Sequence, residues 1–128
     1  KTNNVLHWWP KDKMEEAKAL FCLEVYADEV ILDAEEAPTK VALTFQFANF
    51  APIIIDQKTK EGKPRCQTDQ NGSLHFKFRR GKSAAFEMVP ADLRAALRRH
   101  ALVAMVVGRL TAKQAVLHAT AAIDLAAF

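Results

Sequence analysis

Short runs in which apolar and polar side chains alternate recur along most of this chain. The clearest is KVALTFQF, residues 40–47, where Val41, Leu43, Phe45 and Phe47 fall on one face. A period of two is typical of β-strands, because successive side chains point to opposite faces of a sheet. Further strands are predicted at residues 19–32, 53–55, 74–79, 84–88, 101–107 and 116–125. Their short spacing, without a strand–helix–strand rhythm, predicts an all-β fold, an antiparallel β-sandwich.

One short helix is predicted near residues 91–99. Pro90 and Asp92 suit a helix start, because proline fits the first turn and a carboxylate is favoured at the positive end of the helix dipole. The predicted helix has two distinct faces: Leu93, Ala96 and Leu97 form the apolar one, and Arg94 and Arg98 lie together on another.

The chain has the length of a single domain. At 128 residues, half of them hydrophobic, it can bury a sizeable core. We expect residues 1–17 to form an N-terminal lead-in, and residues 18–128 to form a sandwich domain excised from a longer protein. The tandem Trp8 and Trp9 would either pack against the domain as a clasp or anchor a partner. The polar residues 56–73 are predicted to form a long exposed loop or a hairpin.

The sequence KFRRGKSAAF, residues 77–86, contains the Gly-Lys-Ser that ends a phosphate-binding loop. Such a loop needs another glycine five positions before Gly81, and that position is Phe76. We therefore expect no nucleotide, and Gly81 is predicted to turn the chain between two strands. No cofactor or metal is expected, since the histidines lie far apart and Cys22 and Cys66 lack zinc-site spacing. No serine stands in a nucleophile motif, so an enzyme is not expected.

Charge is distributed unevenly along the chain. Residues 1–57 carry five lysines against ten acids, whereas residues 58–99 carry eleven lysines and arginines against four acids. This asymmetry predicts a dipolar molecule with a basic binding surface. Strand alternation places Lys77 and Arg79 on one solvent-exposed face. The candidate binding residues are Lys77, Arg79, Arg80, Lys82, Arg94 and Arg98.

Several partners could use such a basic surface. An acidic protein surface, including the acidic tails of tubulin, is the expected one, and acidic phospholipids are the alternative. Nucleic acid is not expected, because no exposed aromatic residues are interleaved with the basic ones. The same residues could also form an ordinary solvated surface without a partner.

Four stretches of the chain together resemble C2 domains. LFCLEVYADEVIL resembles the opening strand, PTKVALTFQF the second strand, SAAFEMVPADLRAALRRHALVAMVVGRL a later strand pair with its helical link, and AVLHATAAIDLAAF the closing strand. The resemblance covers residues 18–128 and is closest to the divergent C2 domains of ciliary and centriolar scaffold proteins. It implies a non-catalytic interaction module of a larger cytoskeletal scaffold, located in the cytoplasm at the cytoskeleton, cilium or centrosome.

Classical C2 domains bind calcium through several aspartates on loops at one end of the sandwich. The first loop here offers Asp28, Glu29 and Asp33, but the later residues 108–114, GRLTAKQ, contain no carboxylate. The resemblance therefore implies a calcium-independent C2 domain.

Overall fold

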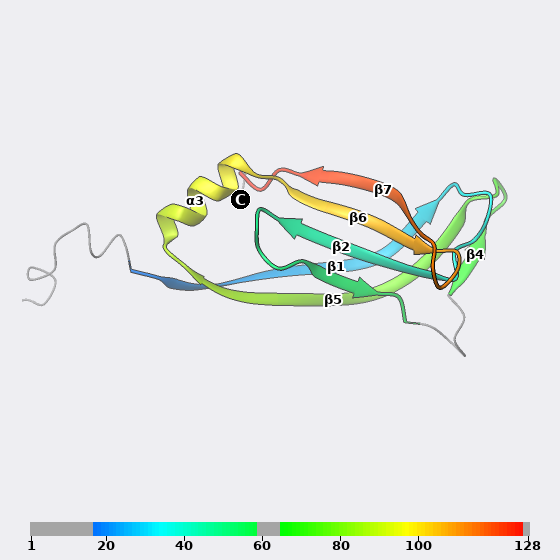
Figure 1. Cartoon of the computed structure of the whole chain (residues 1–128), viewed down its shortest axis with the longest axis horizontal. Helices are drawn as coiled ribbons and strands as arrows, with labels where there is room; N and C mark the ends of the chain where they lie inside the picture. Colours follow the sequence, from blue (N-terminus) through cyan, green and yellow to red (C-terminus); the bar gives the residue numbers. More distant parts are fainter. Residues whose placement is uncertain (1–16, 59–64, 127–128) are drawn as a thin grey trace, which may run out of the picture.

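The computed structural model describes residues 17–58 and 65–126 of the chain (Figure 1). Within these ranges it contains strands β1 (Ala19–Leu32), β2 (Lys40–Phe47), β3 (Ile53–Asp56), β4 (Cys66–Thr68), β5 (Leu74–Met88), β6 (Leu102–Arg109) and β7 (Ala115–Ile123), and helix α3 (Pro90–Arg99). The predicted all-β sandwich with one short helix is confirmed. The lead-in with Trp8 and Trp9 lies outside the described residues. No helix in the described ranges is long and apolar enough to cross a membrane.

Two antiparallel sheets form the sandwich. One has the strand order β1-β5-β4, and the other has the order β3-β2-β6-β7. The strands β1 and β5 run side by side along most of the length of the molecule, with α3 near one end and β4 near the other (Figure 1). The apolar face of β2 turns inward as the alternation predicts, since Val41, Leu43 and Phe47 are all buried.

The strand β5 is continuous through Gly81, so the predicted turn at this glycine is wrong. Tyr26 pairs with Gly81, and the pairing continues residue by residue as far as Ala19 and Met88. The backbone of Gly81 does not adopt the left-handed conformation of a tight turn, whereas that of Gly72 does, with φ of 83°. A Cβ on Gly81 would stand 3.3 Å from the backbone oxygen of Val25 and 3.4 Å from the ring of Tyr26, so glycine here relieves a close approach to the neighbouring strand and does not end β5.

An irregularity separates the two halves of β5. Ala27 pairs with Arg80 and Glu29 pairs with Lys77, so Phe78 and Arg79 together oppose Asp28. This is a β-bulge, in which one strand carries an extra residue, and Arg79 has the unusual φ of 47° that such a position tolerates.

The segment predicted as a long loop or a hairpin, residues 56–73, contains strand β4. This strand pairs with the start of β5 and forms a hairpin. The side chain of Asp69 organises its turn, because Asp69 Oδ1 accepts hydrogen bonds from the backbone N–H groups of Asn71 (2.8 Å) and Ser73 (3.0 Å). The buried Gln57 holds the base of the segment, donating from Nε2 to the carbonyls of Arg65 and Lys77.

The hydrophobic core is concentrated at the half of the sandwich that holds the hairpin. Phe76 is 0% exposed there and is the centre of a cluster of buried residues: Ala27, Val30, Leu32, Val41, Leu43, Ile55, Leu74 and Phe78. Toward α3 the inward-facing side chains of β1 and β5 are only half-buried, and no residue of α3 is fully buried. The sandwich is therefore tightly closed at one end and open at the other.

Candidate functional site

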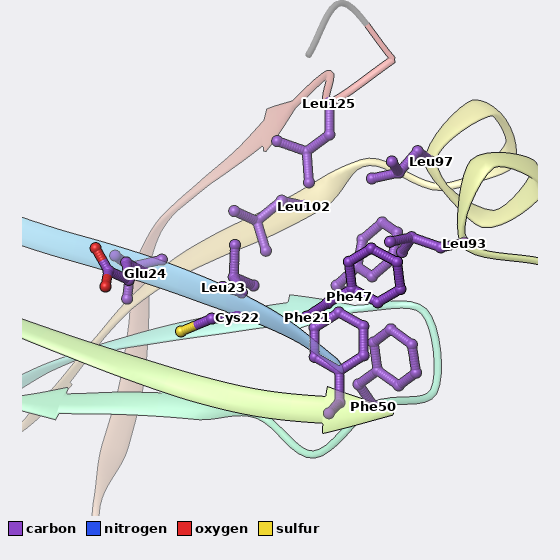
Figure 2. A pocket seen from close by; sticks show the side chains of 12 residues that line it. Phe21, Cys22, Leu23, Glu24, Phe47, Phe50, Leu93, Leu97, Leu102 and Leu125 are labelled. Carbon is purple, nitrogen blue, oxygen red and sulfur yellow. The ribbon is translucent and has the colours of Figure 1, made fainter. Parts of the chain in front are cut away.

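An apolar cleft of about 400 Å³ opens between the two sheets at the end that carries α3 (Figure 2). Its lining residues come from five strands or their flanking loops and from the helix: Phe21, Cys22, Leu23, Glu24, Val25, Phe47, Phe50, Phe86, Leu93, Leu97, Leu102 and Leu125. Glu24 supplies the one carboxylate of this lining. Because nearly all of its wall is hydrocarbon, the cleft suits an apolar side chain of a partner rather than a polar small molecule.

Four aromatic rings form one side of the cleft. Phe21 and Phe86 stack across the β1–β5 pair with ring centroids 5.8 Å apart. Phe50 lies 5.1 Å from Phe86 and 5.6 Å from Phe47, measured between centroids. Offset and tilted ring pairs at these separations are favourable, so the cluster holds its shape without being fully covered.

Helix α3 lies beside this cluster and forms part of the cleft wall. Leu93 and Leu97 project from it toward the aromatic residues, as Figure 2 shows. Asp92 lies in its first turn and Arg98 and Arg99 in its last, where each charge complements the helix dipole. The confirmed amphipathic pattern therefore leaves the leucines facing the cleft and the arginines exposed.

The arginines of α3 form the first of three groups into which the structure divides the predicted basic residues. Arg94 and Arg98 are both exposed and lie one turn apart, and neither makes an ion pair with any other described residue. Together with Arg99 they form what we call the arginine face of α3. Arg94 and Arg98 directly follow Leu93 and Leu97, which line the cleft.

Lys77 and Arg79 form the second group, on the outer face of β5. Lys77 pairs with Glu29 across the strands, and the Nε atom of Arg79 lies 4.0 Å from Asp28 Oδ1. The antiparallel pairing of β1 with β5 thus brings the acidic segment alongside the basic one. Charges separated along the sequence are interleaved in space here, so the predicted dipole does not arise at this surface.

Arg80 and Lys82 form the third group, on the inner side of β5. Arg80 Nη1 donates to the carbonyl of Asp56 (2.8 Å) and Lys82 Nζ donates to the carbonyl of Ile54 (3.0 Å). Both carbonyls belong to β3, which pairs with β2 alone among the described strands. The two cations therefore satisfy backbone acceptors at the open edge of β3, a structural role that the sequence did not reveal.

A histidine cluster at the other end of the molecule was also missed by the sequence analysis. His75 Nε2 lies 2.7 Å from Asp69 Oδ2, and His75 Nδ1 lies 3.2 Å from Glu29 Oε1. The hydrogen bond with Asp69, followed by that with Glu29, raises the pKa of His75. The same contact with His75 and the N–H of Ser73 lower the pKa of Asp69. The Ser73 hydroxyl also donates to Asp33 Oδ1 at 2.6 Å.

These contacts engage Glu29 and Asp33, two of the carboxylates that the C2 resemblance would place near calcium. Glu29 and Asp69 bond opposite nitrogens of one imidazole ring, so they do not converge on a common point. Within residues 17–58 and 65–126, no group of three or more histidine, cysteine, aspartate or glutamate side chains could hold a metal ion.

We predict that the histidine cluster makes the stability of the domain depend on pH. A raised pKa in the folded state stabilises the fold below the ordinary histidine value of 6.5, and this contribution is lost as pH rises through the folded-state pKa. The free energy of unfolding should therefore exceed that of a His75→Gln variant by a margin that is full below the ordinary histidine pKa of 6.5 and shrinks as the pH rises above it. Urea titrations of both proteins at several pH values measure this difference in the free energy of unfolding. A difference that does not change with pH would contradict the prediction.

The chain matches the family described as "Microtubule associated protein 10, N-terminal domain" over residues 34–127. The chain belongs to this family. Membership of this family confirms the prediction that the domain belongs to a cytoskeletal protein. No C2 family is detected. A comparison with curated proteins finds no match.

The part of the chain that matches the microtubule-associated family includes α3 and six of the seven described strands. It therefore contains the whole arginine face and most of the cleft wall, whereas β1, with Phe21 and Leu23, precedes it. Sequence periodicity could find the apolar stripe of α3. It could not show that this stripe meets rings from distant strands, because the phenylalanines involved are spread over more than sixty positions.

Proposed function

We propose that this microtubule-associated domain is a non-catalytic protein-interaction module, and that it binds an acidic protein surface through α3 and the adjoining cleft. The observation that carries the proposal is the orientation of α3. Its leucine face lines an open apolar cleft while its arginine face is exposed. A partner could thus insert an apolar side chain beside the helix and place acidic side chains against the arginines.

This arrangement has the two components of a protein interface. A desolvated apolar or aromatic pocket supplies most of the binding energy at typical interfaces, and arginine is enriched among the residues that dominate it. The surrounding charges accelerate association and select partners of opposite sign. Acidic segments of tubulin, the subunit of the microtubule, have the required charge. We therefore propose a microtubule surface as the partner.

Catalysis is not part of this proposal, for reasons of placement. The groups whose pKa values shift, Asp69, His75 and Cys66, belong to the hairpin end, while the cleft lies at the end with α3. The cleft wall itself offers one carboxylate and the thiol of Cys22. Such a surface can bind a side chain but has no paired acid and base positioned for proton transfer.

We further propose a calcium-independent C2-type fold, within a larger scaffold protein at the cilium or centrosome. The two antiparallel sheets, with seven strands among the described residues, and the C2-like sequence stretches support the fold assignment. The engagement of Glu29 and Asp69 by His75 supports calcium independence. Localisation of the full-length protein, with and without this domain, tests the cellular part of the proposal. A uniform cytoplasmic distribution would contradict it.

The decisive experiment is charge reversal on α3, followed by co-sedimentation with microtubules. Arg94→Glu/Arg98→Glu should weaken microtubule binding at least about tenfold, because two attractive contacts become repulsive. The matched control is Lys40→Glu/Lys113→Glu, which changes net charge equally at exposed positions near the opposite end of β6. The control should bind much more tightly than the α3 variant. Equal loss in both would show that binding depends only on net charge.

Two further arms separate the possible partners. Microtubules whose acidic tails have been removed by protease should lose binding to the wild-type domain, and added salt should weaken the interaction. Vesicles containing phosphatidylserine test the lipid alternative. Vesicle binding that is lost in Arg94→Glu/Arg98→Glu, without any microtubule binding, would replace the proposal by lipid binding.

A further inference from the structure

The strand β1 has a long free edge. Among the described residues it pairs only with β5, and its pairing is regular from Ala19 to Ala27, with the register shift confined to the region beyond Ala27. A free edge presents unpaired backbone N–H and C=O groups that another strand can bind. This stretch contains no proline and no bulge that would prevent such pairing.

The other sheet edges are less suited to accept a strand. The strands β3 and β4 have only four and three residues, and the carbonyls of Ile54 and Asp56 are occupied by Lys82 and Arg80. The strand β7 is longer, but a register shift at His118 interrupts it. The free edge of β1 is therefore the most regular edge in the described part of the sandwich.

The side chains of β1 form a pattern that is complementary to itself. Along the outer face, Lys18 lies directly before β1 and Asp28 lies at its register shift, beside Arg79, and between them Leu20 is 72% and Tyr26 is 66% exposed. The residue midway between each of these pairs is Leu23. A strand of the same sequence, running antiparallel about Leu23, would place Lys18 opposite Asp28 and Leu20 opposite Tyr26.

We propose that this chain forms a symmetric dimer in which β1 pairs antiparallel with β1 of a second copy, about a two-fold axis at Leu23. The pairing joins the two three-stranded sheets into one continuous sheet. It creates two Lys18–Asp28 ion pairs and covers both exposed Leu20–Tyr26 pairs, and opposed aromatic and aliphatic side chains stabilise antiparallel strands. On the inner face, Phe21 meets Val25 of the second copy beside the open side of the cleft.

The charges select this register over its neighbours. Two residues that oppose each other across the paired strands must point to the same face of the joined sheet, so the two-fold axis passes through a residue and not between two residues. The registers next to the one centred on Leu23 are therefore centred on Cys22 and on Glu24. A register centred on Glu24 would place the Glu24 side chains of the two copies directly opposite each other, and this like-charge contact is unfavourable. A register centred on Cys22 would place Lys18 opposite Tyr26 and lose both ion pairs. The dimer rests on the geometry of β1 and does not depend on the proposed binding of microtubules.

A charge-swap series tests the dimer by sedimentation velocity over a range of protein concentrations. Lys18→Asp alone and Asp28→Lys alone should each raise the dimer dissociation constant about tenfold, because each creates two like-charge pairs by symmetry. The double variant Lys18→Asp/Asp28→Lys should return close to the wild-type value. Thermal unfolding of each variant checks that the fold is retained.

Directed cross-linking tests the register independently. In a Cys22→Ser background, Leu23→Cys should form an intermolecular disulfide on oxidation, since directly opposed β-carbons lie about 4.5–5.5 Å apart. The matched variant Val25→Cys should not, because its partner position is Phe21. A wild-type chain that stays monomeric at its highest soluble concentration overturns the proposal. The proposal is also overturned if the dimer dissociation constant is unaffected by the charge-swap variants and Leu23→Cys and Val25→Cys cross-link equally.

Discussion

Replacing Phe76 by alanine should lower the free energy of unfolding by about 3–5 kcal/mol. The ring is 0% exposed and lies on the central strand β5, where its cross-strand partners are Val30 and Cys66. Removing it leaves a cavity that neighbours anchored in two sheets cannot fill. Since small domains are stable by only about 5–15 kcal/mol, the variant should be partly unfolded under mild conditions.

Urea denaturation followed by circular dichroism measures this loss. Phe86→Ala serves as the matched control, because it removes the same ring from the same strand at a half-buried position beside the cleft. Its cost should be clearly smaller. If the two substitutions cost the same, the core is not concentrated at the hairpin end as described.

Substituting Gly108 with alanine should destabilise the domain by about 1–3 kcal/mol, because it overfills a packed site. A Cβ at this position would contact the ring of His118, with Cδ2 only 2.7 Å away, and would lie 2.9 Å from Cβ of the fully buried Pro38. Neither ring can withdraw without disturbing β7 or the entry to β2. The melting temperature reports the effect.

A second substitution identifies the cause. His118→Ala in the Gly108→Ala background should recover part of the lost stability, since it removes one of the two colliding rings. Gly72→Ala provides a contrasting glycine, because a Cβ there meets nothing within 4 Å and the cost comes only from its φ of 83°. Full tolerance of alanine at Gly108 would contradict the close packing of β6 against Pro38.

Alternation and helical periodicity were sufficient to predict the sandwich, most of its strands and α3, but not β4 or the continuity of β5. They are local properties, and they also place Lys77 and Arg79 correctly on the outer face of β5. The prediction failed at Gly81, where glycine was interpreted as a turn. Whether a glycine ends a strand depends on the neighbouring strand, and here the ring of Tyr26 covers a glycine that continues the ladder.

The division of the basic residues could not be predicted from the sequence for a related reason. Nearness along β5 suggested one patch, yet a strand turns successive side chains to opposite faces. Arg80 reaches the carbonyl of Asp56 because β3 belongs to the facing sheet, and only the packing of the sheets reveals this. The contact between His75 and Glu29 likewise joins residues 46 positions apart.

The occupied carbonyls of β3 also bear on how large an assembly of this domain can become. A filament that grows by strand addition needs two available edges on each subunit, so that every added copy presents a new one. Arg80 and Lys82 obstruct growth at β3, and the irregular pairing of β7 disfavours it at the second sheet. With β1 as the one regular edge in the described sandwich, association through strands closes after a single partner. In the proposed dimer, Arg80 and Lys82, two side chains that resembled a ligand-binding patch in the sequence, would thus help to keep the protein from polymerising.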